Sequence, residues 1–217
     1  MKLSKQAPPS HSASSRTSII PQPDQHSALL LIDLQNDFFP GGALAVPGAD
    51  SLISPINTYI KHFSRQGWSI LATRDWHPAH HTSFTEQQGP WPAHCVQGSR
   101  GAQFHSDLVM PPGMMVISKG TDPRKDARSG FDGTSLADRL EDLHVQTLFV
   151  LGLATDYCVK HTVIDGCAHS FRVVLLTDAT RGINRQPHDS STALKEMADA
   201  GAFLANINDI GLAASPP

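Results

Sequence analysis

The chain has 217 residues and a formal net charge of -3, and its charged side chains form no acidic or basic block. This length suits one domain with a sizeable core, and the lack of a clustered basic face argues against a nucleic-acid partner. The apolar runs are far shorter than the roughly 18–20 residues that cross a bilayer, so we expect no membrane partner. The three cysteines do not form the even set of a disulfide framework. No signal-peptide core follows the first residue, so we expect a cytoplasmic protein with free thiols.

Residues 1–27 differ in composition from the rest of the chain. They are rich in Ser, Pro and Gln and show no hydrophobic period, which predicts a disordered or loosely ordered tail. Residues 28–217 are predicted to form a single domain.

Within this domain, short apolar runs alternate with stretches of helical periodicity. The runs predict strands at 28–34, 69–73, 114–118, 147–154, 172–177 and 203–206, and the periodic stretches predict helices at 51–65, 135–143, 156–170 and 189–200. Strands that alternate with helices form a sheet with helices on both faces. The sequence therefore predicts an α/β fold, a three-layer sandwich around a mainly parallel six-stranded sheet.

Four reactive side chains are predicted to meet at one edge of this sheet. Asp33, Asp75 and Lys119 each end a predicted strand, and Cys158 follows the fourth strand closely. In parallel sheets, ligands bind beyond the carboxyl ends of the strands. We therefore expect a catalytic site there.

Cys158 is the predicted nucleophile of this site. With Thr155 as the expected N-cap, Cys158 would lie in the first helical turn, where the helix dipole lowers the pKa of a thiol. Cys167 lies on the apolar stripe of the same helix and is expected to be structural. Asp33 is the expected base, and a cation at Lys119 would lower the thiol pKa further and orient the carboxylate.

A histidine-rich segment after the second strand indicates a metal site. Asp75 and His77 alternate in an extended stretch and so point to one side, and His94 would complete a set of one carboxylate and two imidazoles, to which His81 could add. Such a set suits one divalent ion, Zn²⁺ first, with Fe²⁺ or Mn²⁺ as alternatives. Two other interpretations stay open, namely a closed structural zinc site that includes Cys95 and surface histidines without a metal.

Several long motifs carry a resemblance to a known family. They are ALLLIDLQNDFFPGGALAVPGAD, TRDWHPAHHTSF, WPAHCVQGSRGAQFH, SKGTD, SGFDGTSLADRL, GLATDYCVKHTVIDG and TDATRGIN. With these motifs the chain resembles the nicotinamidases and pyrazinamidases of the isochorismatase-like hydrolase superfamily, from residue 28 to about 207.

The resemblance implies an isochorismatase-like fold and the hydrolysis of nicotinamide to nicotinate and ammonia in NAD salvage, through a cysteine thioester, with pyrazinamide as a further substrate. It implies Asp33, Lys119 and Cys158 as the catalytic triad. It implies Asp75, His77 and His94 as metal ligands, with His81 coordinating in some members only.

The resemblance also implies details of the substrate pocket. These are a cis peptide between Leu153 and Ala154, an oxyanion hole formed by the N–H groups of Ala154 and Cys158, and Phe38 and Trp91 as aromatics that sandwich the substrate ring.

One position departs from the family pattern, because Arg128 stands where family members often carry an aromatic residue. We expect its side chain to face solvent.

The rival activity, cleavage of isochorismate, is disfavoured by the set of Asp75, His77 and His94, since that reaction in the family needs neither metal nor cysteine. A catalytically silent scaffold is disfavoured by the intact triad. A small-molecule substrate is the expected partner, and a homo-oligomer is left open.

Overall fold

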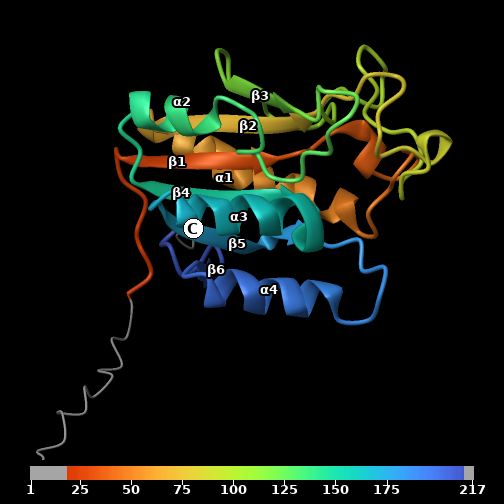
Figure 1. Ribbon diagram of the computed structural model, residues 1–217. Coiled ribbons are helices and arrows are strands. Elements are labelled where there is room, and N and C mark those ends of the chain that lie inside the picture. Colours follow the sequence, from red (N-terminus) through yellow and green to blue (C-terminus); the bar gives the residue numbers. More distant parts are fainter. Residues whose placement is uncertain (1–18, 213–217) are drawn as a thin grey trace, which may run out of the picture.

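Six parallel strands form one sheet in the order β3-β2-β1-β4-β5-β6 in the computed structural model, which describes residues 19–212 (Figure 1). The strands are β1 (Ser27–Ile32), β2 (Ser69–Asp75), β3 (Met115–Lys119), β4 (Thr147–Leu153), β5 (Arg172–Arg181) and β6 (Phe203–Ala205). Every neighbouring pair is parallel. The predicted α/β fold is confirmed, and β5 continues beyond its predicted end at residue 177.

Helices cover both faces of the sheet. They are α1 (Ile53–Gln66), α2 (Leu136–Asp142), α3 (Lys160–Ala168) and α4 (Asp189–Asp199), with short 3-10 turns at η1 (Asn36–Phe38), η2 (Ala49–Leu52) and η3 (Thr85–Gln87) and a π turn at η4 (Thr155–Val159). None of the helices within residues 19–212 combines the length and the apolar content needed to cross a bilayer.

The core consists of two apolar clusters, one on each face of the sheet. Leu29 and Leu31 of β1 lie in the same cluster as the buried residues of α1. Leu30 and Ile32 lie in the other cluster with the buried residues of α2, α3 and α4. Because successive side chains of a strand point to opposite faces, β1 needs apolar residues at every position. This explains its continuous run of apolar residues and its complete burial.

Part of the predicted tail lies against the domain. Residues 1–18 fall outside the described residues. Ile20 packs against the cluster that contains α1, and the Gln22 side chain donates a hydrogen bond of 3.0 Å to the Asp209 carbonyl. Strand β1 begins at Ser27, the last residue of that segment.

Candidate active site

Three charged side chains meet where β1, β2 and β3 end. Asp75 and Lys119 are the last residues of β2 and β3 and are partners in register, so their side chains leave the sheet on the same side. The Lys119 Nζ atom lies 2.6 Å from Asp75 Oδ1 and 3.0 Å from Asp33 Oδ2. All three residues are buried. The sequence predicted that these side chains meet at this edge of the sheet, because each lies at the end of a predicted strand.

Asp33 occupies the first position after β1, in a left-handed conformation with φ of 48°. The backbone therefore turns sharply there, and the carboxylate points toward the neighbouring strand. Its Oδ1 atom accepts a hydrogen bond of 2.7 Å from the Thr73 hydroxyl. Its Oδ2 atom faces Lys119, so the carboxylate is held from both sides.

Cys158 completes this group from the other side of β1. Its sulfur lies 3.3 Å from Lys119 Nζ, and the sulfur and one oxygen each of Asp33 and Asp75 lie within 4.8 Å of one another. Sequence positions that are far apart thus bring a thiol, two carboxylates and one ammonium into contact.

The turn that carries Cys158 differs from the predicted helix start. The prediction of Thr155 as N-cap was wrong, because Thr155 already belongs to the π turn and the extended Ala154 precedes it. The Val159 N–H donates to the Ala154 carbonyl at 3.1 Å, which widens the turn. The Thr155 hydroxyl instead pairs with the Thr180 hydroxyl at 2.8 Å. The bond between Leu153 and Ala154 is cis, as the resemblance implies.

The pKa values of Cys158, Asp33 and Lys119 depend both on burial and on the charges of the neighbouring side chains. Burial raises the pKa of Cys158 well above its ordinary value, although Lys119 opposes this effect. Lys119 thus lowers the thiol pKa as expected, but desolvation outweighs this effect, so the net shift of the pKa is upward rather than downward. Burial also raises the pKa of Asp33 against the influence of Lys119. Burial alone would lower the pKa of Lys119, but Asp33 and Asp75 raise it well above its ordinary value.

A second group of side chains lies next to the first and shares Asp75 with it. The Nε2 atom of His77 is 3.7 Å from Asp75 Oδ1, and the Nε2 atom of His94 is 3.9 Å from Asp75 Oδ2. One donor atom from each of the three residues lies within 4.8 Å of the others, and all three residues are buried.

The donor atoms of this group are oriented for a cation. The Nδ1 atom of His77 donates to the Gly120 carbonyl at 3.0 Å, and Nδ1 of His94 donates to the Pro92 carbonyl at 2.8 Å. With the proton on Nδ1, each Nε2 atom keeps a free lone pair on the side of Asp75. Histidine ligands in metal sites usually bind the ion through one nitrogen while the other ring N–H donates to a carbonyl group in this way. A carboxylate and two imidazoles of this kind fit a divalent ion.

His81 lies beside this group but does not point a free nitrogen into it. Its ring centroid is 4.2 Å from that of His77. Its Nε2 atom donates to the Lys125 carbonyl at 3.1 Å, and its Nδ1 atom pairs with the Ser83 hydroxyl at 2.7 Å. Among the described residues, neither His81 nor the buried Cys95 joins the clusters of ligand atoms. The arrangement therefore favours an open site with three protein ligands over the closed zinc site.

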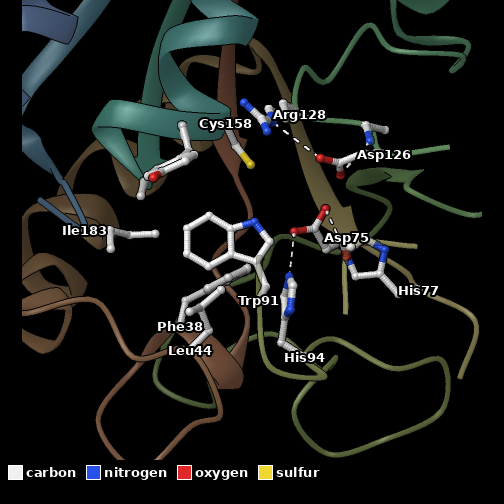
Figure 2. A pocket seen from close by; sticks show the side chains of 14 residues that line it. Phe38, Leu44, Asp75, His77, Trp91, His94, Asp126, Arg128, Cys158 and Ile183 are labelled. Carbon is white, nitrogen blue, oxygen red and sulfur yellow. Dashed lines mark hydrogen bonds and ion pairs between the residues drawn. The ribbon is translucent and has the colours of Figure 1, made fainter. Parts of the chain in front are cut away.

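A cavity opens in front of Cys158 (Figure 2). Both predicted pocket aromatics, Phe38 and Trp91, line it, and so do Ala154, Asp75, His77 and His94. Figure 2 shows the Trp91 ring between the sulfur of Cys158 and the apolar side chains of Phe38 and Leu44. The cavity therefore has one apolar side and one side that carries the reactive groups.

Sequence reasoning missed several lining residues, namely Leu44, Ser83, Asp126, Ala127, Tyr157 and Ile183. Four of them lie in motifs that carried the resemblance, namely Leu44, Ser83, Tyr157, which precedes the nucleophile, and Ile183, which lies in TDATRGIN. The ring of Tyr157 lies edge-on to Trp91, with 5.0 Å between the centroids. The positions of these missed residues in the motifs could have pointed to them, but the sequence does not show in which direction their side chains point.

Arg128 lies at the mouth of the cavity. Its side chain is exposed, as expected, and it also lines the cavity. Its Nε atom is 3.4 Å from Asp126 Oδ2, and this pair is drawn in Figure 2. The expectation of a purely solvent-facing side chain was therefore incomplete.

Two buried or partly buried polar residues near η1 support the site and were also missed. The Gln35 amide accepts from the Asp75 N–H at 2.7 Å and donates to the Asp75 carbonyl at 2.7 Å and to the Ala102 carbonyl at 2.9 Å. Asp37 accepts from the Cys95 N–H at 2.7 Å. Both follow Asp33 closely in LQND, so the segment after β1 fixes the backbone at Asp75 and next to His94.

Comparisons with known proteins identify the family of this chain. Residues 27–209 match the isochorismatase domain family. The chain is 44% identical over 203 residues to a nicotinamidase of Escherichia coli (strain K12), which covers 84% of this chain and 95% of that protein. The crystal structure of a pyrazinamidase of Pyrococcus horikoshii in complex with zinc matches with a TM-score of 0.80 and 46% identity, over 83% of this chain and 99% of that one. A protein from L. infantum in complex with nicotinate matches with a TM-score of 0.81 and 36% identity, over 88% of this chain and 98% of that one. The chain therefore belongs to the isochorismatase domain family.

Proposed function

We propose that this chain hydrolyses nicotinamide to nicotinate and ammonia and that it acts on pyrazinamide in the same way. The observation that carries the proposal is the contact of Lys119 with both Cys158 and Asp33 beside a cavity lined by aromatic side chains. The names of the similar proteins, a nicotinamidase and a pyrazinamidase, support this choice of substrates.

The first half of the reaction transfers the acyl group to sulfur. The Cys158 thiol loses its proton to the Asp33 carboxylate, and the thiolate attacks the carboxamide carbon. The N–H groups of Ala154 and Cys158 stabilise the oxyanion. The carboxyl group of Asp33 then gives its proton to the amide nitrogen, the C–N bond breaks, and ammonia leaves a thioester behind. A raised pKa at Asp33 suits this role, because the proton must be taken from a thiol and later returned.

The second half of the reaction releases the acid. A water molecule attacks the thioester carbon while Asp33 accepts its proton, the C–S bond breaks, and the Cys158 sulfur regains a proton. Lys119 contributes through charge, because its ammonium stabilises the thiolate and the Asp33 carboxylate in turn. The buried contact of its Nζ atom with both groups supports this role.

Asp75, His77 and His94 would hold a divalent ion, and Zn²⁺ is the ion we propose first, with Fe²⁺ and Mn²⁺ as alternatives. When bound, such an ion supplies a Lewis acid that orients the pyridine nitrogen of the substrate. Phe38 and Trp91 would pack against the ring and keep the carboxamide near Cys158. His81 would support His77 from its side rather than bind the ion directly.

The test is ammonia and acid release from a panel of amides by the purified protein supplied with Zn²⁺. Nicotinamide and pyrazinamide should each give one ammonia per acid, and benzamide, which lacks the ring nitrogen, should react much more slowly. No ammonia from nicotinamide would overturn the proposed function. Equal rates for benzamide and nicotinamide would refute recognition of the ring nitrogen.

A further inference from the structure

Asp156 is a buried carboxylate that the proposed reaction does not use. It lies two residues before Cys158, in the same π turn, and only 7% of it is exposed. Its two oxygens accept backbone hydrogen bonds from one segment. The Ile183 N–H donates to Oδ1 at 2.9 Å, and the Asn184 N–H donates to Oδ2 at 2.7 Å. Hydrogen bonds to a charged acceptor are stronger than neutral ones, so this carboxylate holds the segment firmly.

The segment from residue 182 to 185 forms a wall of the cavity. Ile183 lines the cavity, and Figure 2 shows its side chain directed toward the ring of Trp91. The guanidinium of Arg185 lies over the same ring, 5.1 Å from its centroid. The position of this segment therefore affects both the apolar wall and the aromatic residue that the substrate ring would contact.

The same segment has little room to move. The Asn184 side chain accepts from the Ser190 N–H at 3.0 Å, which ties the segment to α4. A Cβ atom added at Gly182 would overlap Ser190 Oγ and would lie 3.1 Å from Asp156 Oδ1. Asp156 on one side and α4 on the other thus fix the backbone between them.

We infer that Asp156 is a positioning residue that sets the spacing between the nucleophile and the apolar wall of the substrate pocket. Its side chain joins the turn that carries Cys158 to the segment that carries Ile183 through two hydrogen bonds. One side chain therefore fixes the position of the cavity wall relative to the turn that carries the sulfur. The inference rests on the proposed function for its kinetic consequence, but its structural consequence does not need a substrate.

The kinetic test compares Asp156→Ala, Ile183→Ala and the double variant. Asp156→Ala should raise the KM for nicotinamide by about 10- to 100-fold, the scale on which misplaced binding groups act, with a smaller change in kcat. If Asp156 acts through the wall, the Asp156→Ala change should cost much less in the Ile183→Ala background. Asp156→Asn keeps one oxygen acceptor and should recover part of the loss. Asp165→Ala, which changes a half-buried aspartate of α3 outside the cavity, is the matched control and should leave KM unchanged.

The structural test is amide hydrogen exchange. Asp156→Ala and, to a smaller extent, Asp156→Asn should speed exchange at Ile183 and Asn184, whereas Asp165→Ala should not. Unchanged exchange there, an unchanged KM in Asp156→Ala, or independent effects of the two substitutions would overturn the inference. If the wild-type protein releases no ammonia from nicotinamide, the proposed function fails, and the exchange result still decides whether Asp156 holds the segment.

Discussion

At the scale of single residues, Asp75 takes part in both halves of the site. Its Oδ1 atom contacts Lys119 Nζ at 2.6 Å, and its Oδ2 atom faces His94. Burial would raise the pKa of Asp75, but Lys119 and His77 lower it below its ordinary value. The Lys119 ammonium thus allows two buried carboxylates, Asp33 and Asp75, to lie close to each other. An uncompensated charge in such a place would be costly.

Removing this ammonium should lower both the free energy of unfolding and kcat. In Lys119→Met the side chain keeps a similar length, but the two carboxylates lose their counter-charge. We expect the free energy of unfolding to fall by about 3–5 kcal/mol, as for other buried pairs that lose one partner. We expect kcat to fall by about 100-fold or more. Denaturant unfolding and ammonia release measure the two effects.

The matched control for this prediction is Lys195→Met, which removes an exposed lysine paired with Asp199 on α4. It should leave the unfolding midpoint and the rate unchanged. A Lys119→Met protein as stable and as active as the wild type would show that the buried ammonium has neither role.

At the scale of elements, the site depends on the segments that follow β1 and β2. Gln35 is buried and links the ends of these strands, because its side chain pairs with both backbone groups of Asp75 and with the Ala102 carbonyl. The backbone of Asp75 thereby has a fixed orientation. Residues that orient a metal ligand in this way affect metal affinity even though they do not touch the ion.

Gln35→Ala should therefore weaken metal binding and lower stability. Three buried hydrogen bonds disappear, and each buried group left without a partner costs about 1–3 kcal/mol. Affinity for Zn²⁺ should fall by about 10- to 100-fold, measured by competition with a chromophoric chelator. Gln97→Ala removes an exposed glutamine that bonds to the Trp76 carbonyl, and its affinity should stay at the wild-type level. Equal affinities in both variants would rule out a role for Gln35 in orienting Asp75.

The sequence was sufficient to predict the six strands and to place Asp33, Asp75 and Lys119 at or next to the ends of β1, β2 and β3, although β5 extends beyond its predicted end. The apolar runs of β1 and β4 are diagnostic, because a strand covered on both faces needs apolar residues at each position. Parallel strands end at one edge, which placed Asp33 and Lys119 near each other without knowledge of any contact. The local details depended on long-range packing. The pairing of Thr155 with Thr180 and the direction of Ile183 follow from β5 and its following segment, which no local pattern in the sequence describes.

At the scale of the whole molecule, the apolar core and the reactive groups adjoin at one edge of the sheet. The two apolar clusters lie on the faces of the sheet. Asp33, Asp75 and Lys119 lie at the ends of β1, β2 and β3, and Cys158, in the turn after β4, packs against one of the clusters. A small substitution at that edge should leave the fold intact. A loss of activity in a Cys158→Ala variant can therefore be assigned to the chemistry, provided that the variant unfolds at the wild-type temperature.

The nucleophilic role of Cys158 is tested by the rate of ammonia release from nicotinamide in the Cys158→Ala variant. We expect this rate to fall to the uncatalysed background, while Cys167→Ala, which changes a half-buried cysteine of α3 that packs against the core, keeps a rate close to that of the wild type. A folded Cys158→Ala protein that releases ammonia at the wild-type rate would show that Cys158 is not the nucleophile and that hydrolysis does not proceed through a thioester, because no other thiol lines the cavity within the described part of the chain.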